Sequence, residues 1–592
     1  MADDGPFWLD DHIFASANLE APIERTVRLT SNLNAGARLT GDYYPIEVTN
    51  YFTGGKYSSG LTEDQLPTIT MNLAQNIGNS PAVCYFYGQH LFFASSIQEP
   101  EKVWKSSLNN YHDFARQPVL TPTGSFDFEI FTNDFSRVKY IRGLLEPIVF
   151  TGREEWSLGQ DLSPTGLSPK PQTAYGVGDV PPVHTENSLL FVSGDRTVRD
   201  IGYNFQDGGY KGNDLTLFSS HLFEGKKIIA ASFQKYPSPV YWTVCDDGSV
   251  QSMTYFKEQN IFAWSEHEFP NRAVEVASVN GEGVSHVFFS FINENGEFTL
   301  EKLANIDRTD DRTFRFMDSH KYFDFRNKDA TKTVLLETML PMGNTNRFTN
   351  NDTMMELTLA GHEFDPMPPF IDLLSDAGYI RLVVTGVTTP KTKFKVRVDD
   401  DVPGGFREEA TAGWSLPVNE LDEGLDHLRD KEVSVIADGS VISSPNDPQA
   451  LHMKVALTEG RNRIKLGGYY SVICVGLPFV SDMGTLPIDL RGDDTVIDQN
   501  MIVNNIALYV HNTRGLFIGS EEPEDKTSTV GLVGLKTNFD GEPEIRPENG
   551  IVRKVINGSW NNRGEIIVRQ VDPLPMNLQG ILVTGDLVKE GN

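Results

Sequence analysis

Short apolar runs separated by turn residues dominate the middle of the chain, and residues 201–268 show this pattern most clearly. Four β-prone runs follow one another there, at 228–233, 240–245, 249–256 and 262–264. The second and third runs are joined by an Asp-Gly pair, which is typical of a tight hairpin because glycine accepts the positive φ that such turns require. Four short strands in series form an antiparallel meander, the unit of a propeller blade.

The same arrangement recurs on both sides of this segment. Similar sets of apolar runs occupy residues 82–95, 147–158, 189–202 and 274–303. Their starts recur at roughly 45 residues, within the range of propeller blades. No sequence signature repeats with them, so the repeat is one of pattern alone. The pattern predicts a propeller-like domain over residues 76–330.

The rest of the chain also favours strands. Residues 1–75 contain one clearly alternating run, at 26–30, and are interpreted as a partial N-terminal β domain. Residues 331–420 are richer in Asp, Asn, Thr and Pro and are interpreted as an inserted β domain. Residues 421–592 form a C-terminal β domain, with an Asp-Gly hairpin turn at 438–439. The predicted fold class is mainly β: a propeller-like meander domain, additional sandwich-like or barrel-like domains, and few short helices.

Helix signals are weak. Asn213 or Asp214 could cap a short helix over residues 215–223, and residues 139–145 are a second candidate.

The charge balance is strongly acidic. The 592 residues carry a formal net charge of −30. This argues against a protein that coats DNA, because coating requires cations that displace counterions from the phosphates. An acidic conduit would repel a passing duplex, but an acidic surface also simply keeps a protein soluble. The charge alone does not choose between these two explanations.

The sequence shows no membrane-spanning or export signal. No apolar segment reaches the roughly 18 residues of a membrane-spanning helix. The first residues lack a basic and then apolar signal. We therefore expect a soluble protein without a stable membrane segment, made and folded in the cytoplasm.

The three cysteines, Cys84, Cys245 and Cys474, stand singly inside apolar runs. No CxxC spacing occurs, so buried reduced thiols are expected rather than disulfides or metal ligands.

Histidines give no metal-site signal. His184, His221, His267 and His286 lie within one predicted domain, but none has the spacing of a helical or strand-borne ligand pair. They are interpreted as hydrogen-bonded structural residues. Phosphate loops, HExxH and GxSxG motifs do not occur.

Two acidic doublets are the residues that most suggest a catalytic site. Glu154-Glu155 and Asp246-Asp247 resemble the carboxylate pair of a glycosidase. Adjacent residues on a strand point to opposite faces, so neither pair shares one cleft, and we interpret them as a strand edge and a turn. The run at 399–401 lacks the acidic spacing of a calcium loop and is interpreted as a solvated turn. No catalytic, cofactor-binding or metal-binding residue is therefore predicted.

A series of short motifs runs in order through nearly the whole chain. They are DGPF at 4–7, PAVCYFYGQHLFFAS at 81–95, KVWKSS at 102–107, NYHDF at 110–114, EW at 155–156, SPT at 163–165, LLFV at 189–192, RDIGY at 199–203, YKGNDLTL at 210–217, YWTVCDDGS at 241–249, MTYFKEQNIFAW at 253–264, LDHL at 425–428, VSVIADG at 433–439, VGLPF at 475–479 and DPLP at 572–575. In this order they resemble the tail tubular protein B, or nozzle protein, family of short-tailed bacteriophages (podoviruses).

The resemblance implies a structural virion protein and no enzyme. Six copies would form a ring, a homohexamer, below the tail adaptor (tail tubular protein A-like). The ring would extend the tail tube, retain the genome, conduct double-stranded DNA through an acidic channel during ejection, and carry tail fibres or spikes. Family members usually have a region before the DGPF-like segment. This chain begins almost at that segment, so we expect that region to be on a separate gene or lost.

Two alternatives stay open. One is a tail-associated polysaccharide depolymerase, because propellers often host hydrolases. The other is a glycan-binding module without enzyme activity.

Overall fold

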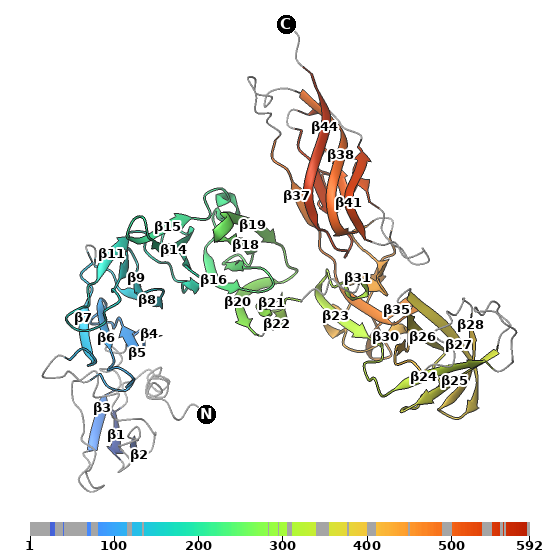
Figure 1. Ribbon diagram of the computed structural model, residues 1–592, viewed down its shortest axis with the longest axis horizontal. Coiled ribbons are helices and arrows are strands. Elements are labelled where there is room, and N and C mark those ends of the chain that lie inside the picture. The colour runs from blue at the N-terminus through green and yellow to red at the C-terminus, as the bar shows by residue number, and fades with distance from the viewer. Residues whose placement is uncertain are drawn as a thin grey trace. The chain divides into compact units, whose positions relative to one another are not determined.

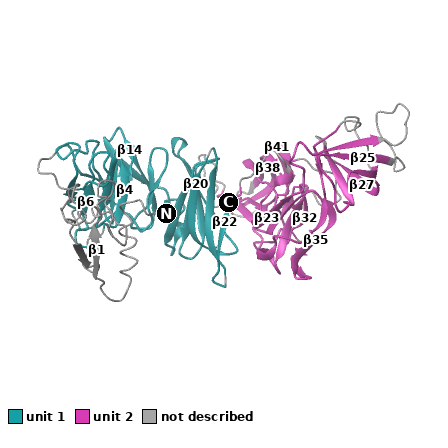
Figure 2. Cartoon of the chain, turned by 90° about the horizontal axis from the view of Figure 1, so that it is seen from below, with its two compact units in different colours: residues 1–303 teal, residues 304–592 magenta. Residues whose placement is uncertain are grey.

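The computed structural model describes most of the chain. The described residues are 24–29, 39–40, 68–72, 81–114, 121–132, 135–281, 283–293, 295–304, 311–338, 354–375, 378–398, 410–447, 450–487, 500–535, 547–556, 560–561 and 564–588. They divide between two compact units, Met1–Leu303 and Ala304–Asn592 (Figure 2). In these residues the chain is mainly β with few short helices, as the sequence predicts. The four-domain division stays a prediction.

The first unit begins with a small sheet. It has the order β2-β1-β3, built from β1 (Glu24–Leu29), β2 (Leu39–Thr40) and β3 (Thr68–Asn72). β1 confirms the strand expected near residue 26.

Five sheets then follow in chain order within residues 81–303 as described, and Figure 1 labels strands from each. The first four are four-stranded antiparallel meanders, and the fifth has three strands. The strands are β4 (Val83–Tyr87), β5 (His90–Ala94), β6 (Lys102–Lys105), β7 (Phe126–Glu129); β8 (Val138–Gly143), β9 (Pro147–Thr151), β10 (Glu155–Ser157), β11 (Lys170–Thr173); β12 (Val183–His184), β13 (Leu189–Val192), β14 (Val198–Asn204), β15 (Gly209–Asp214); β16 (Ile228–Gln234), β17 (Val240–Cys245), β18 (Val250–Phe256), β19 (Ile261–His267); and β20 (Arg272–Asn280), β21 (Ser285–Ile292), β22 (Phe298–Lys302).

Consecutive sheets share their hydrophobic cores. Leu189 and Phe191 of β13 pack in a cluster with the sheet before them, whereas Leu190 belongs to a cluster with the sheet after them. On β17, Tyr241 and Trp242 divide in the same way between two clusters. Successive strand residues point to opposite faces, so each such sheet is covered on both sides. This face-to-face stacking explains the uninterrupted apolar runs of the sequence and makes the domain propeller-like.

Both weak helix predictions are largely wrong. Residues 139–145 fall mainly in β8, which pairs with β9 and carries both buried and half-buried side chains. Of residues 215–223, only η4 (Ser220–Phe223) is helical, as a single 3₁₀ turn. Asn213 and Asp214 end β15 and pair with β14, and the residue before η4 is Ser219, which makes no side-chain cap hydrogen bond. Strand pairing outweighs the local helix propensity at both places.

The second unit contains five further sheets in its described part. Its strands are β23 (Asp318–Asp324), β24 (Thr333–Thr338), β25 (Met354–Ala360), β26 (Phe370–Ser375), β27 (Gly378–Thr389), β28 (Lys393–Val398), β29 (Trp414–Ser415), β30 (Val418–Leu421), β31 (Glu432–Ala437), β32 (Ser440–Ser443), β33 (Met453–Lys454), β34 (Ala456–Thr458), β35 (Arg461–Tyr470), β36 (Val472–Leu477), β37 (Ser481–Gly484), β38 (Asn500–Thr513), β39 (Phe517–Gly519), β40 (Val533–Gly534), β41 (Glu548–Val555), β42 (Trp560–Asn561), β43 (Ile567–Gln570) and β44 (Leu578–Val588). The short 3₁₀ helices η5 (Lys257–Gln259), η6 (Asp311–Thr313) and η8 (Asp426–Leu428) complete the described elements.

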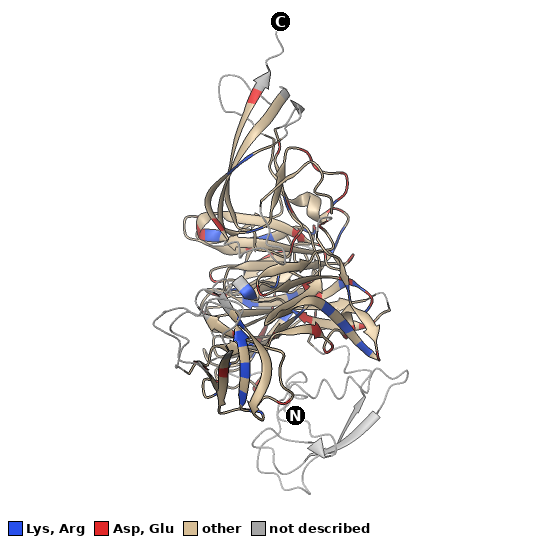
Figure 3. Cartoon of the chain, turned by 90° about the vertical axis from the view of Figure 1, so that its right-hand side faces the viewer, with Lys and Arg blue, Asp and Glu red and all other residues tan. Residues whose placement is uncertain are grey.

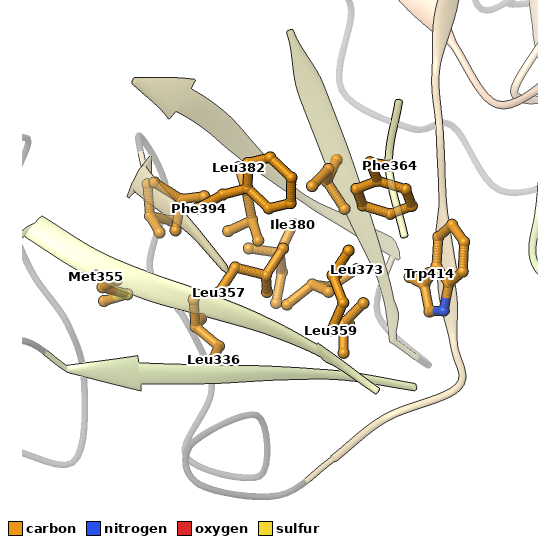
Figure 4. Close-up of a cluster of buried hydrophobic side chains, with 14 residues drawn as sticks. Leu336, Met355, Leu357, Leu359, Phe364, Leu373, Ile380, Leu382, Phe394 and Trp414 are labelled. Carbon is orange, nitrogen blue, oxygen red and sulfur yellow. The ribbon is translucent and has the colours of Figure 1, made fainter. Parts of the chain in front are cut away.

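Most described strands of the segment predicted as an inserted β domain form one sheet, and only β30 at its end pairs elsewhere. The order of this sheet is β24-β25-β28-β27-β26-β29, and it encloses its own core (Figure 4). Leu357, Phe394 and Leu382 meet there from three of these strands, with Phe364 and Trp414 at one end. Each large apolar side chain buried in this way contributes on the order of 1.5 to 3 kcal/mol.

The remaining sheets pair segments that are distant in sequence. β23 pairs with β36, in the order β23-β36-β31-β32, with β33 beside β31. A second sheet, β30-β35-β34, shares a core with it. The last two sheets, β37-β43-β39-β40 and β41-β38-β42 with β44 beside β38, enclose another common core.

Candidate functional site

The four histidines considered above do not converge. His184 and His221 are exposed. His267 accepts or donates a hydrogen bond at Nε2 with Ser252 Oγ, at 2.7 Å, and burial lowers its pKa to about 4. Nδ1 of His286 is buried without a hydrogen-bond partner among the described residues, so the prediction of a hydrogen-bonded role is wrong for that atom. The neutral His267 ring therefore packs between a serine and the Trp242 ring and has a structural role.

The two residues of each acidic doublet make different contacts. Asp246 and Asp247 form the predicted turn: Asp246 Oδ1 accepts from the Lys227 N–H, and Asp247 Oδ1 accepts from the N–H of Ser249, both at 2.9 Å. Gly248 completes that turn with a φ of +91°. Residues 399–401 lie outside the described residues. Among those described, no group of three or more His, Cys, Asp or Glu side chains is placed to hold a metal ion.

Cysteine burial is only partly as predicted. All three thiols are free, and Cys245 and Cys474 are buried, which raises their pKa values to about 11 and about 12. Cys84 is exposed, so the expectation of burial is wrong there. It stands at an outward position of β4, the end strand of its sheet, where alternate side chains face solvent.

Glu155 is the most perturbed carboxyl group. It is fully buried at the start of β10, between β9 and β11. Its Oε2 accepts from Thr173 Oγ1 at 2.6 Å and from the Tyr175 N–H at 3.2 Å, while Oε1 has no partner among the described residues. Burial raises the pKa of Glu155 to about 7, against these hydrogen bonds and the nearby Arg199 charge, which lower it. Its neighbour Glu154 instead accepts from the indole N–H of Trp156 at 3.1 Å.

A buried ionic network joins the third and fourth sheets of the series. Asp200, fully buried on β14, accepts from Lys257 Nζ at 2.8 Å and from the Tyr255 hydroxyl at 3.4 Å. Tyr255 also shares a 2.8 Å hydrogen bond with Ser188 Oγ, and Asp200 Oδ1 accepts from the N–H of Asn213. Sequence reasoning missed this network. The available signal is an aspartate at an inward position of an apolar strand, two residues after Val198.

A buried lysine lies in the first sheet of the series. Lys105 is fully buried, and its Nζ donates to the carbonyl oxygens of Ser106 and Gly124 at 3.2 and 3.1 Å. His90 Nδ1 lies 3.2 Å from the same Nζ. Burial lowers the pKa of Lys105 to about 8, and burial together with the Lys105 charge lowers that of His90. The ammonium group also lies 4.9 Å from the centroid of the Phe126 ring.

Two further ion pairs stabilise the second unit. Arg381 binds both oxygens of the fully buried Asp372, at 2.9 and 2.8 Å, and donates to the Tyr469 carbonyl at 2.7 Å. Arg569, also fully buried, binds both oxygens of Asp482 at 2.7 and 2.8 Å. The Arg569–Asp482 pair and the Arg381 bond to Tyr469 join segments that are distant in sequence, whereas Arg381 and Asp372 are partners on the neighbouring strands β27 and β26.

One open groove occurs beside the first sheet of the series. It has a volume of about 510 Å³ and is lined by Phe126, Asp127, Phe128, Glu129, Phe131, Trp156, Pro164, Leu167 and Pro169. Glu129 and Phe131 are exposed, Phe131 by 77%. Asp127 lies 3.3 Å from Lys102 Nζ. The lining side chains comprise aromatic and apolar groups with two carboxylates and no cation.

Charge of both signs is interspersed over the described elements (Figure 3). Across the described ranges, no helix is long and apolar enough to cross a membrane.

No protein-family model matches the chain, and no curated protein sequence matches it. Among solved structures, the chain is similar to the β-propeller domain of Cps50 (Swd1) from Myceliophteria thermophila, at 8% identity and a TM-score of 0.23, covering 53% of this chain and 96% of that chain. It is similar to YCF48 bound to D1 peptide, at 11% identity and a TM-score of 0.23, covering 53% and 89%. It is also similar to a chain in the crystal structure of Kap60 bound to yeast RCC1 (Prp20), at 12% identity and a TM-score of 0.25, covering 48% of this chain and 80% of that chain. Likenesses this distant carry no argument about function.

Proposed function

We propose that this chain is a structural tail protein of the nozzle type from a short-tailed bacteriophage, with no enzyme activity and no cofactor. About six copies form a ring below the tail adaptor, and the ring extends the tube through which the genome leaves the virion. Fibres or spikes attach to its flank. The proposal rests on the ordered motifs and on where those motifs lie in the fold.

The observation that carries the proposal is that the motif residues meet one another in buried contacts between sheets. Asp200 belongs to the RDIGY motif, and its partners Tyr255 and Lys257 belong to MTYFKEQNIFAW. Trp264, from the end of that second motif, donates its indole N–H to the carbonyl of Leu215 in YKGNDLTL, at 2.8 Å. Motif residues placed in this way stabilise stacked sheets.

Residues of two motifs are also in buried contact within the first sheet of the series. His90 of the PAVCYFYGQHLFFAS motif and Lys105 of KVWKSS are buried neighbours. A catalytic group has to reach a substrate, whereas these groups are enclosed and partnered within the protein. Their arrangement suits a protein that bears load without chemistry.

Electron microscopy of the full chain, alone and mixed with the tail adaptor protein that the proposal requires, tests the proposal. We expect a closed ring of about six subunits. A chain that stays monomeric in both preparations would contradict the nozzle function.

A parallel assay addresses the depolymerase alternative. We expect no release of reducing sugar from capsule or lipopolysaccharide of the host. Release that disappears in the Glu154→Gln or Asp246→Asn variant would show that the chain is an enzyme.

A further inference from the structure

The groove beside the first sheet follows the edge of strand β7. Phe126, Asp127, Phe128 and Glu129 are consecutive, and all four line it. Successive side chains of a strand point to opposite faces, and a groove beside the strand edge is within reach of all four residues. β7 is the end strand of its sheet and pairs only with β6 among the described strands.

The hydrogen-bond pattern shows which main-chain groups of β7 face the groove. The Ile130 N–H donates to the carbonyl of Glu101 at 3.1 Å, on the β6 side. In antiparallel pairs, bonded and non-bonded positions alternate. Phe128, two residues earlier, therefore bonds to β6. Glu129, between these two, directs its N–H and C=O away from β6, toward the groove.

The groove therefore offers a strand edge, an apolar wall and negative charge together. Phe128 is half-buried, and Leu167 and Pro169 also line the groove. Its negative charge comes from the exposed Glu129, since Asp127 is paired with Lys102 at 3.3 Å. A strand edge pairs readily with another extended chain, and pockets beside it select alternate side chains.

We propose that β7 is a docking edge for an extended segment of a partner protein, which adds to the sheet as a further strand. The segment alternates apolar side chains, which enter between Phe128 and Leu167, with lysine or arginine, which face Glu129. This goes beyond the proposed function, since it requires neither a ring nor DNA. A sugar stacked on the aromatic rings would use the rings but not the main chain of Glu129, which distinguishes the two occupants.

Fluorescence polarisation with the full chain tests this proposal. The probe is a labelled peptide of about eight residues, a typical strand length, in which lysine alternates with valine and leucine. The comparison peptide has the same sequence with alternate main-chain nitrogens methylated. Salt at about 0.15 M limits non-specific attraction to the acidic chain. Methylation removes main-chain donors but keeps every charge, so we expect it to weaken binding by about tenfold or more.

Variants of one residue separate charge from main-chain pairing. Glu129→Pro removes the outward N–H without removing a hydrogen bond to β6, and we expect about tenfold weaker binding. We expect Glu129→Gln, which keeps the strand, to weaken binding about threefold and to do so less at high salt. The exposed Glu224, on another part of the unit, provides the charge-matched control Glu224→Gln, which should bind as the unchanged protein does.

Five outcomes would overturn the proposal. Equal binding of the methylated peptide would show attraction by charge alone. No binding of either peptide would show that the edge is closed. Unchanged binding by Glu129→Pro would place the peptide elsewhere. Competition by a host oligosaccharide, or dimerisation of the chain that Glu129→Pro abolishes, would show a different occupant.

Discussion

Glu155 combines full burial, an Oε1 atom without a hydrogen-bond partner among the described residues, and a pKa raised to about 7 by burial. In the unfolded chain the same carboxyl titrates near 4.5. Below pH 4.5 it is protonated in both states. Between pH 4.5 and 7 the folded protein holds a proton that the unfolded chain has lost, so the free energy of unfolding falls as the pH rises through this window.

We expect Glu155→Gln to remove this pH dependence. The amide oxygen can accept from Thr173 and Tyr175, and the amide group never ionises. The unchanged protein should lose on the order of 1 to 3 kcal/mol more than the variant between pH 4.5 and 7.5. Thermal or urea unfolding across that range measures the difference. Parallel curves for the two proteins would show that Glu155 keeps its ordinary pKa.

At the scale of single elements, strands and turns follow from the sequence because their causes are local. The Asp-Gly turn at 438–439 has the positive φ values of 49° and 82° that such a hairpin requires. The helix predicted at 139–145 is wrong because pairing with β9 decides that segment. The Asp200–Lys257 pair and the β7 groove could not be predicted, since they depend on which sheets face each other.

The turn between β17 and β18 provides a test at this scale. Gly248 has a φ of +91°, and a Cβ there would lie 2.2 Å from Arg272 Cγ. Gly248→Ala should therefore cost on the order of 1 to 3 kcal/mol in the free energy of unfolding, from strained backbone and crowding. Gly281, between β20 and β21, has no positive φ and no contact below 3.5 Å, so Gly281→Ala is the control and should cost less than about 0.5 kcal/mol. Equal effects in urea unfolding would refute the strain argument.

The contact between the third and fourth sheets gives another prediction. Lys257→Met leaves the fully buried Asp200 carboxylate without its ammonium partner. The free energy of unfolding should fall by on the order of 3 kcal/mol. Because the lysine side chain is 38% exposed, water that reaches the carboxylate should reduce this loss. Adding Asp200→Asn removes the unpaired buried charge and should recover part of the lost free energy of unfolding.

The matched control for that experiment is the exposed pair of Lys211 and Asp207, 3.3 Å apart on the same sheet. Lys211→Met should change the unfolding free energy by less than about 0.5 kcal/mol. If both lysine variants behave alike in urea unfolding, the buried network does not stabilise the contact between sheets.

For the whole molecule, the net charge sets a condition on assembly. Each chain carries −30, so about six copies brought into a ring repel one another over distances set by the Debye length. That length is about 10 Å at 0.1 M salt and about 3 Å at 1 M. Apolar contacts between subunits weaken little over this range, whereas the repulsion is screened.

We therefore expect the fraction of chains in rings to rise with salt, from about 0.05 to 0.5 M, at fixed protein concentration, as measured by light scattering or sedimentation. Sucrose in place of salt is the control for general crowding and leaves the repulsion unscreened. The same charge should keep the proposed ring from binding free duplex DNA at about 0.15 M salt, because a protein with net negative charge repels the phosphates. Rings that dissociate as salt rises would mean that ion pairs, rather than apolar contacts, join the subunits. The acidic residues would then lie at the subunit interfaces instead of along the proposed channel.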